Sequence, residues 1–168
     1  MPPWTLKPAR GIDEPMDDLE DTQARARALA LKLLSRRFQS TRRLTGELTA
    51  AGYEDDTVEE VVAYLKSCGY LDDKRLVDGF VERAKREFRG PLWLDQQLAQ
   101  EGLSAPVSTD GRTSLERAER ELAKCALLTR HAPPLNQAEA RRASQYLTRR
   151  GFTADTIQSV VADAFEPD

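Results

Sequence analysis

A glycine followed by an apolar residue recurs along this 168-residue chain at a nearly constant interval. Gly52, Gly102 and Gly151 are 50 and then 49 residues apart, and each stands four residues after a leucine. A glycine just beyond the last turn of a helix can take the positive φ that ends the helix, and the next residue then often packs back onto it. Gly69, four residues after Leu65, is a fourth copy. The signature therefore predicts four helix ends, and the expected packed pairs are Tyr53 with Leu48, Leu103 with Leu98, Phe152 with Leu147, and Tyr70 with Leu65.

Apolar residues on either side of each signature follow the period of an α-helix. The stripe from Val58 to Leu65 places apolar residues at i, i+3, i+4 and i+7, and an equivalent stripe begins at Ile157. A stripe that ends at Phe38 returns 50 residues later and ends at Phe88. Each unit therefore contains three helices. A repeat of this length indicates an all-α chain built as a tandem array of three units of about 50 residues.

Proline and glycine positions suggest where the units begin and end. Pro106 and Gly111 interrupt the place of the middle unit's third helix, so we expect that helix to be irregular. The first 21 residues contain six acids, two bases and no apolar period, and we predict that they are disordered. The expected divisions are an acidic segment (1–21), a first repeat (22–71), a second repeat with an irregular third helix (72–112) and a third repeat (113–168).

The net charge of −3 conceals a strong separation of charge along the chain. Residues 22–43 contain seven basic residues and no acid, whereas residues 44–82 contain ten acids and three bases. Such a chain should present separate positive and negative surfaces. The basic clusters are either solvated helix faces or a stripe that binds phosphate or acidic groups. The candidate partner- or DNA-binding residues are Arg36, Arg37, Arg42, Arg43, Arg83, Lys85, Arg86, Arg89, Arg141, Arg142, Arg149 and Arg150.

No pattern of catalytic or metal-binding residues is found in the sequence. The single histidine, His131, stands beside two prolines, and the two cysteines are far apart, so we expect no zinc site. Nucleotide-binding glycine loops and hydrolase motifs are absent. We therefore predict a protein that is not an enzyme and needs no cofactor or metal. The lack of a long apolar run or a secretory signal favours a cytoplasmic protein without membrane contact, which we expect to be a monomer.

Three stretches of the chain resemble the RecX family, whose members regulate the RecA recombinase. They are Leu33–Ser40, Leu44–Gly52 and Leu65–Leu76, and the most specific part is the Gly-Tyr-Leu-Asp-Asp turn that begins at Gly69. An Arg-Gly step ending at Gly90 stands where that family has one before its second leucine-rich helix. The resemblance extends over about residues 22–165.

The resemblance implies an elongated, curved array that binds the RecA–DNA filament and usually inhibits strand exchange and ATP hydrolysis, a role in DNA repair, recombination and the SOS response. Any direct contact with DNA would be weak or made through the filament. Two alternatives remain open on the residues alone: a helical protein that binds DNA by itself, and a helical adaptor with another protein partner. Residues 22–168 hold 23 basic and 22 acidic groups, and this near balance disfavours tight DNA binding without a partner.

Overall fold

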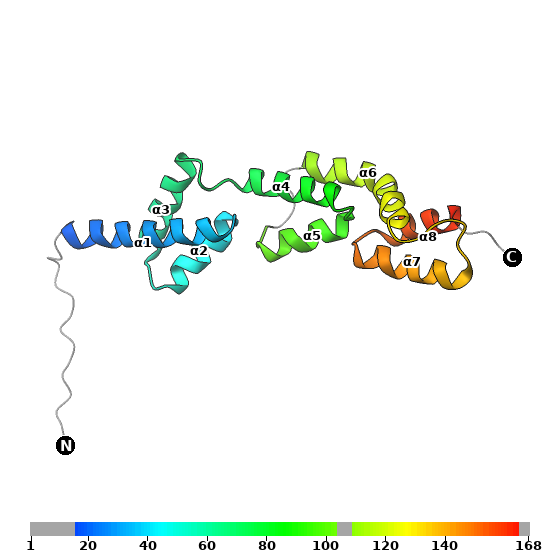
Figure 1. Ribbon diagram of the computed structural model, residues 1–168. Coiled ribbons are helices and arrows are strands. Elements are labelled where there is room, and N and C mark those ends of the chain that lie inside the picture. The colour runs from blue at the N-terminus through cyan, green and yellow to red at the C-terminus, as the bar shows by residue number, and fades with distance from the viewer. Residues whose placement is uncertain (1–15, 104–108, 165–168) are drawn as a thin grey trace, which may run out of the picture.

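The computed structural model describes residues 16–103 and 109–164. Within these ranges the chain forms helices and no strand, so the predicted all-α class is confirmed (Figure 1). The eight described helices are α1 (Met16–Arg36), α2 (Thr41–Ala50), α3 (Asp55–Ser67), α4 (Asp73–Arg86), α5 (Pro91–Gln100), α6 (Thr109–Leu128), α7 (Gln137–Arg149) and α8 (Ala154–Asp163).

All four glycines of the signature end a helix in the left-handed conformation. Their φ angles are 95° at Gly52, 72° at Gly69, 68° at Gly102 and 80° at Gly151. In each case the following residue donates its N–H to the carbonyl of the leucine five positions earlier, at 2.9 to 3.3 Å. This bond is typical of a helix that ends with a left-handed glycine. The predicted helix ends are confirmed.

The residue after each glycine packs as expected in three of the four copies. Phe152 is fully buried, and Tyr53 and Leu103 lie against the cores of their units. Tyr70 makes the backbone bond to Leu65 at 2.9 Å, but its side chain is 54% exposed. The prediction that Tyr70 packs back is therefore wrong, since its ring belongs to none of the three described cores.

The helices enclose three separate apolar cores, one after another along the molecule. Leu44 lies in the core of α1–α3, Leu94 in the core between α4, α5 and the start of α6, and Leu147 in the core between α6, α7 and α8. Leu122 of α6 packs against both the second and the third core. The second and third units are therefore joined by apolar packing.

Helix α6 belongs to two units at once. It packs against α4 and α5 and also against α7 and α8. It is thus the third helix of the middle unit and the first helix of the last one. The place where we expected an irregular third helix includes residues 104–108, which lie outside the described residues, and residues 109–112, which form the first turn of α6.

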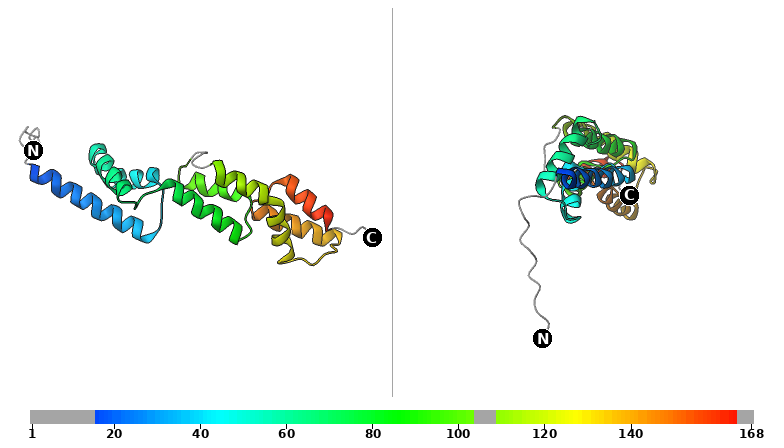
Figure 2. Two further views of the ribbon diagram at one scale, coloured as in Figure 1. Left: turned by 90° about the horizontal axis from the view of Figure 1, so that it is seen from above. Right: turned by 90° about the vertical axis from the view of Figure 1, so that its left-hand side faces the viewer.

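The three bundles follow one another in a row, which makes the molecule elongated and slightly arched (Figures 1 and 2). Helices α1–α3 form one end and α7 and α8 the other. Helix α1 begins at Met16, so the prediction of disorder is wrong for residues 16–21. Residues 1–15 lie outside the described residues. An extended row of bundles offers a long surface rather than an enclosed cleft.

Candidate functional site

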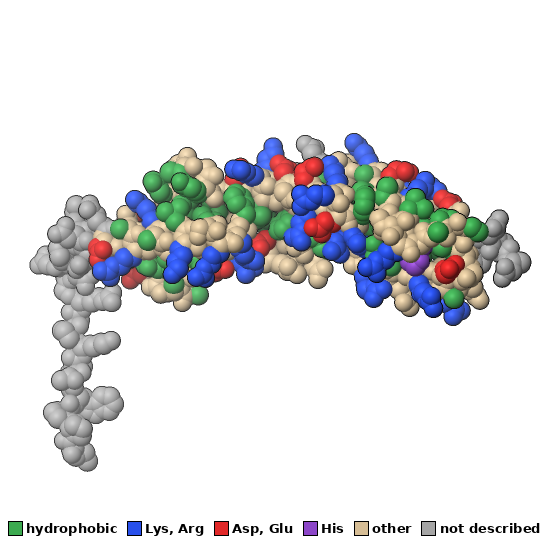
Figure 3. Space-filling view, viewed as in Figure 1, with side chains coloured by type: hydrophobic (Ala, Val, Ile, Leu, Met, Phe, Trp, Pro, Cys, Tyr) green, Lys and Arg blue, Asp and Glu red, His purple; other side chains and the backbone are tan. Residues whose placement is uncertain are grey.

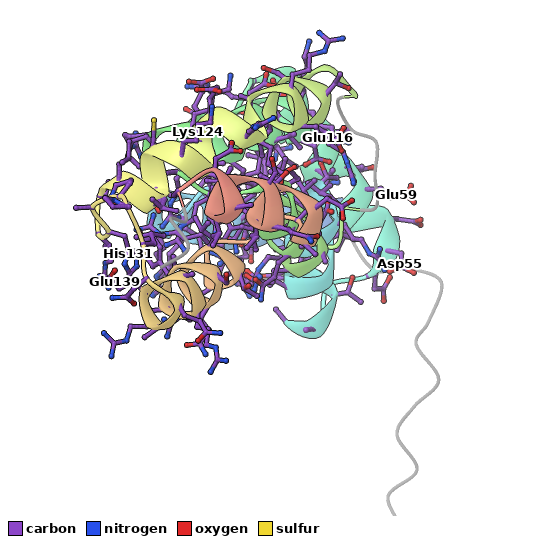
Figure 4. All side chains as sticks on the ribbon, turned by 90° about the vertical axis from the view of Figure 1, so that its right-hand side faces the viewer. Asp55, Glu59, Glu116, Lys124, His131 and Glu139 are labelled. Atoms are coloured by element: carbon purple, nitrogen blue, oxygen red, sulfur yellow. The ribbon has the colours of Figure 1, made fainter. Side chains whose placement is uncertain are left out.

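Lys and Arg side chains follow the lower edge of the molecule in Figure 3 over most of its length, and others lie along its upper edge over α4 and α6. Those of the lower, basic edge lie over α1, near the turn between α4 and α5, and over α7. The acidic Asp55 and Glu59 of α3 lie on the side of the molecule away from α7, as the view along the long axis shows (Figure 4). The basic edge is therefore the candidate interface with a negatively charged partner.

Five of the twelve candidate residues are free to meet a partner. Arg36 ends α1, Arg86 ends α4, and Arg141, Arg142 and Arg149 project from α7. All five are exposed, and none makes an ion pair within the described part of the chain. Three separate elements thus carry unpaired guanidinium groups.

Arg37 and Arg43 instead bind a buried carboxylate of another unit. Glu101, the residue after α5, is only 6% exposed. Its carboxylate accepts hydrogen bonds from Arg37 Nη2 and from the backbone N–H of Ser40, both at 3.2 Å, and lies 3.7 Å from Arg43 Nη1. Ser40 Oγ also donates to the Glu101 carbonyl at 2.5 Å. A buried carboxylate with such partners is compensated for its loss of water.

Arg42 and Arg43 complete this contact at the end of α5. Arg42 Nη1 donates to the carbonyl of Gly102 at 3.0 Å, and Arg43 Nη1 to that of Gln100 at 3.4 Å. The last carbonyls of a helix lack partners within the helix and attract cations. We call the contact of Arg37, Ser40, Arg42 and Arg43 with residues 100–102 the first joint, because it connects the first unit to the second.

A second joint connects the middle unit to the last one at equivalent helix ends. The N–H of Gly90 donates to the carbonyl of Arg150 at 2.9 Å, and that of Leu92 to the carbonyl of Gly151 at 3.0 Å. A Cβ added at Gly90 would lie 2.2 Å from the Gly151 carbonyl oxygen, so only glycine permits this approach. The Arg150 guanidinium donates to the carbonyl of Glu87. The second joint comprises residues 87–93 and 150–152.

The two joints repeat one contact along the array. Ser40 and Gly90 are the N-caps of α2 and α5, and Glu101 and Arg150 are the C-caps of α5 and α7. In each joint the start of one unit's short helix meets the end of the next unit's short helix. The period of the glycine signature is therefore also the period of the contacts between units.

The basic cluster of α4 is largely occupied within the molecule. Arg83 Nε donates to the Glu87 carboxylate at 2.9 Å, and Arg89 lies 3.5 Å from the same group. The hydrogen bond from Arg83 lowers the pKa of Glu87, and the positive charges of Arg83 and Arg89 act in the same direction. Both guanidinium groups also face the ring of Trp93, at 5.6 and 5.8 Å. This cluster offers less free charge than its sequence suggests.

Lys85, the last of the candidate residues, forms an ion pair with the exposed Glu82 at 3.2 Å. Glu101 was not singled out in the sequence, although it is the one acid directly before a signature glycine, where the first and third units have Ala51 and Arg150. That difference between repeats is the signal that could have identified it.

The described residues contain no group of three or more His, Cys, Asp or Glu side chains placed to hold a metal ion. His131 lies edge-on to Tyr146, with 6.3 Å between the ring centroids. Across the described ranges, no helix combines the length and the apolar character needed to cross a membrane.

Comparison with known proteins identifies the family. Residues 26–65 match the profile of the first three-helix domain of RecX. The chain is 33% identical over 141 residues to regulatory protein RecX of Stenotrophomonas maltophilia K279a, an alignment that covers 83% of this chain and 85% of that protein. It is 34% identical over 147 residues to regulatory protein RecX of Halorhodospira halophila, with 84% and 89% covered. The chain belongs to the RecX family.

Solved RecX structures have the same fold. The crystal structure of RecX from Lactobacillus salivarius matches with a TM-score of 0.69 and 16% identity over 86% of this chain and 97% of that one. A crystal structure of regulatory protein RecX matches with a TM-score of 0.65 and 21% identity over 90% and 80%. The resemblance to RecX seen in the sequence is confirmed. These relatives are named as regulatory proteins, and none of the names describes an enzyme.

Proposed function

We propose that this RecX-family chain binds the RecA–DNA filament and inhibits recombinase activity and ATP hydrolysis. The observation that carries the proposal is the set of five unpaired arginines, which come from α1, α4 and α7 and so extend over the length of the molecule. An elongated row of bundles can sum many weak contacts along a charged groove. The proposed function implies a cytoplasmic monomer that acts in DNA repair and recombination.

The test compares wild type with a variant in which all five free arginines become glutamine: R36Q, R86Q, R141Q, R142Q and R149Q. We expect wild type to suppress the filament's ATPase activity and the variant to bind more weakly. Each lost phosphate contact should also lower the slope of log affinity against log salt by about 0.7 to 0.9. Equal inhibition by both proteins would contradict the proposed interface.

A control variant removes two cations that are already paired. K85Q with R120Q takes away two positive charges whose partners are Glu82 and Asp163. Because these cations are engaged with acids on the surface, we expect the control to inhibit as wild type does. Reversal of Arg37, Arg42 and Arg43 is avoided here, since it would also break the first joint.

A DNA-binding protein that acts alone would use the same arginines, and the distinction is quantitative. Fluorescence anisotropy with single- and double-stranded oligonucleotides at two salt concentrations measures binding without the recombinase. We expect binding much weaker than to the filament, because basic and acidic residues nearly balance over residues 22–168. Equally tight binding to free DNA would instead favour the solitary DNA-binding protein.

A further inference from the structure

The first unit is attached to the rest of the molecule mainly by polar groups. Helix pairs with extensive contact lie either within α1–α3 or within α4–α8. No apolar side chain among the described residues packs against both the first and the second core, whereas Leu122 joins the second and third. The apolar contact across this boundary is an open hollow in which Phe38, 42% exposed, lies beside Leu76 and Phe80 of α4. The first joint therefore carries most of the polar attachment, together with a 2.7 Å hydrogen bond from the Thr41 N–H to Asp73.

We propose that the first joint is an ionic latch, and that helices α1–α3 swing away as one body when a phosphate backbone captures Arg37, Arg42 and Arg43. The proposal goes beyond filament binding and requires no recombinase. It gives the latched arginines a second role: they hold the closed arrangement until a nucleic acid competes for them.

The accessibility of the joint favours such competition. The side chains of Arg37 and Arg43 are 47% and 36% exposed, so solvent and phosphate can reach them while they hold Glu101. Free Arg36 stands next to Arg37 in the chain and raises the local positive charge. Guanidinium groups bind phosphate with two parallel hydrogen bonds, which matches or exceeds a single bond to a carboxylate.

Because Glu101 is buried, the loss of its arginine partners should cause the first unit to move away from the second. Once the arginines leave, Glu101 retains only the Ser40 contacts and is a buried charge without a counter-ion. Such a charge is strongly unfavourable in a protein interior, so the carboxylate regains water by separating the joint. The second joint lacks this dependence because it contains backbone hydrogen bonds, its Arg150 guanidinium binds a neutral carbonyl, and its units share α6. Movement should therefore be confined to the first unit.

The chain's two cysteines report on this movement without further mutagenesis. Cys68 follows α3 in the moving body, Cys125 lies on α6, and both are free and exposed. Spin labels on these two residues allow the distance between them to be measured by pulsed electron paramagnetic resonance. The samples are wild type at low salt, wild type at high salt, and wild type with a single-stranded oligonucleotide whose binding is followed by anisotropy.

We expect one narrow distance at about 50 mM salt, and a second, longer population at several-fold higher salt or with bound oligonucleotide. R37Q combined with R43Q should show the longer population already at low salt. E101Q should show it to a smaller extent and respond little to salt, because the glutamine amide carries no charge. E82Q, which changes an exposed acid remote from the joint, should behave as wild type.

Three results would overturn the proposal. If the label-to-label distance in the R37Q/R43Q variant equals the wild-type distance at every salt concentration, the first joint is not an ionic latch. If the oligonucleotide binds without changing the distance, or does not bind, the proposal that a phosphate backbone captures the arginines is contradicted. Circular dichroism of each labelled variant establishes that the helices remain folded, and filament inhibition is measured separately, so that this proposal and the proposed function can fail independently.

Discussion

The first and second joints bring together the same two helix ends, but they hold them with different chemistry. In the first joint, side chains do the binding: Ser40 and three arginines surround Glu101 and the last carbonyls of α5. In the second, Gly90 lets two backbones approach closely, and the N–H groups of Gly90 and Leu92 donate to the carbonyls of Arg150 and Gly151. The arginines of the first joint are partly exposed, and ion pairs that salt can reach weaken as ionic strength rises, whereas backbone contacts beside a shared core do not. One repeated geometry thus produces a joint that responds to ions and a joint that is rigid.

The largest expected effect comes from a methyl group in the second joint. In Gly90→Ala the new Cβ would lie 2.2 Å from the Gly151 carbonyl oxygen and 2.6 Å from the Phe152 Cα. Backbone atoms must move, so we expect a loss of about 3 kcal/mol in the free energy of unfolding. Urea denaturation followed by circular dichroism measures it.

Gly46→Ala is the matched control for this substitution. Gly46 lies inside α2, and an added Cβ meets nothing within 4 Å. The same change should therefore stabilise the chain by about 0.5 to 1 kcal/mol. If both substitutions change the free energy of unfolding by similar amounts, the close approach of the two backbones in the second joint does not contribute to stability.

The three signature glycines of the short helices provide a graded comparison of the joints. Gly52→Ala places a Cβ in open space, so the free energy of unfolding should fall only by the cost of a positive φ, about 1 to 2 kcal/mol. At Gly102 the Cβ also meets Arg42 Cδ at 2.9 Å, and this flexible side chain can move away. At Gly151 it meets the Trp93 backbone nitrogen at 2.4 Å. The order of destabilisation in urea should be Gly151, then Gly102, then Gly52, and a reversal of the first two would contradict the description of the second joint as the rigid one.

Removal of the Ser40 hydroxyl tests the first joint. Ser40 Oγ accepts from the Arg43 N–H at 3.1 Å as the N-cap of α2 and donates to the Glu101 carbonyl. Ser40→Ala loses both bonds at a buried position, and we expect a cost of about 1 to 2 kcal/mol. Thermal unfolding measures it against Ser35→Ala, which loses one exposed bond to the Lys32 carbonyl and should be near neutral.

The smallest expected effect is a pH dependence in the second joint. The hydrogen bond from Arg83 lowers the pKa of Glu87 below its ordinary value of 4.5 in the folded chain. The resulting stabilisation is present above that ordinary value and is lost as the pH falls through the lowered pKa. Glu87→Gln and Arg83→Gln should both flatten the fall in melting temperature below pH 4.5. An unchanged slope in both variants would show that the pair does not contribute.

Local patterns predicted the helix ends well because the interactions that form them are local. A left-handed glycine, the leucine before it and the apolar residue after it lie within six residues, so their spacing in the chain is also their spacing in space. Tyr70 is the exception, since its burial depends on where the next helix goes. The sharing of α6 between two units likewise needs the packing of four other helices.

The sequence by itself determined the helical class, the positions of the four signature glycines and the equivalence of the basic clusters in successive units. Only the tertiary structure decided which of those cations are free. Arg36 and Arg37 are neighbours in the chain, yet one faces solvent and the other holds a buried carboxylate 64 residues away. Whether a guanidinium is available to a partner depends on which helix ends meet, and that is settled by packing between units rather than by the residues beside it.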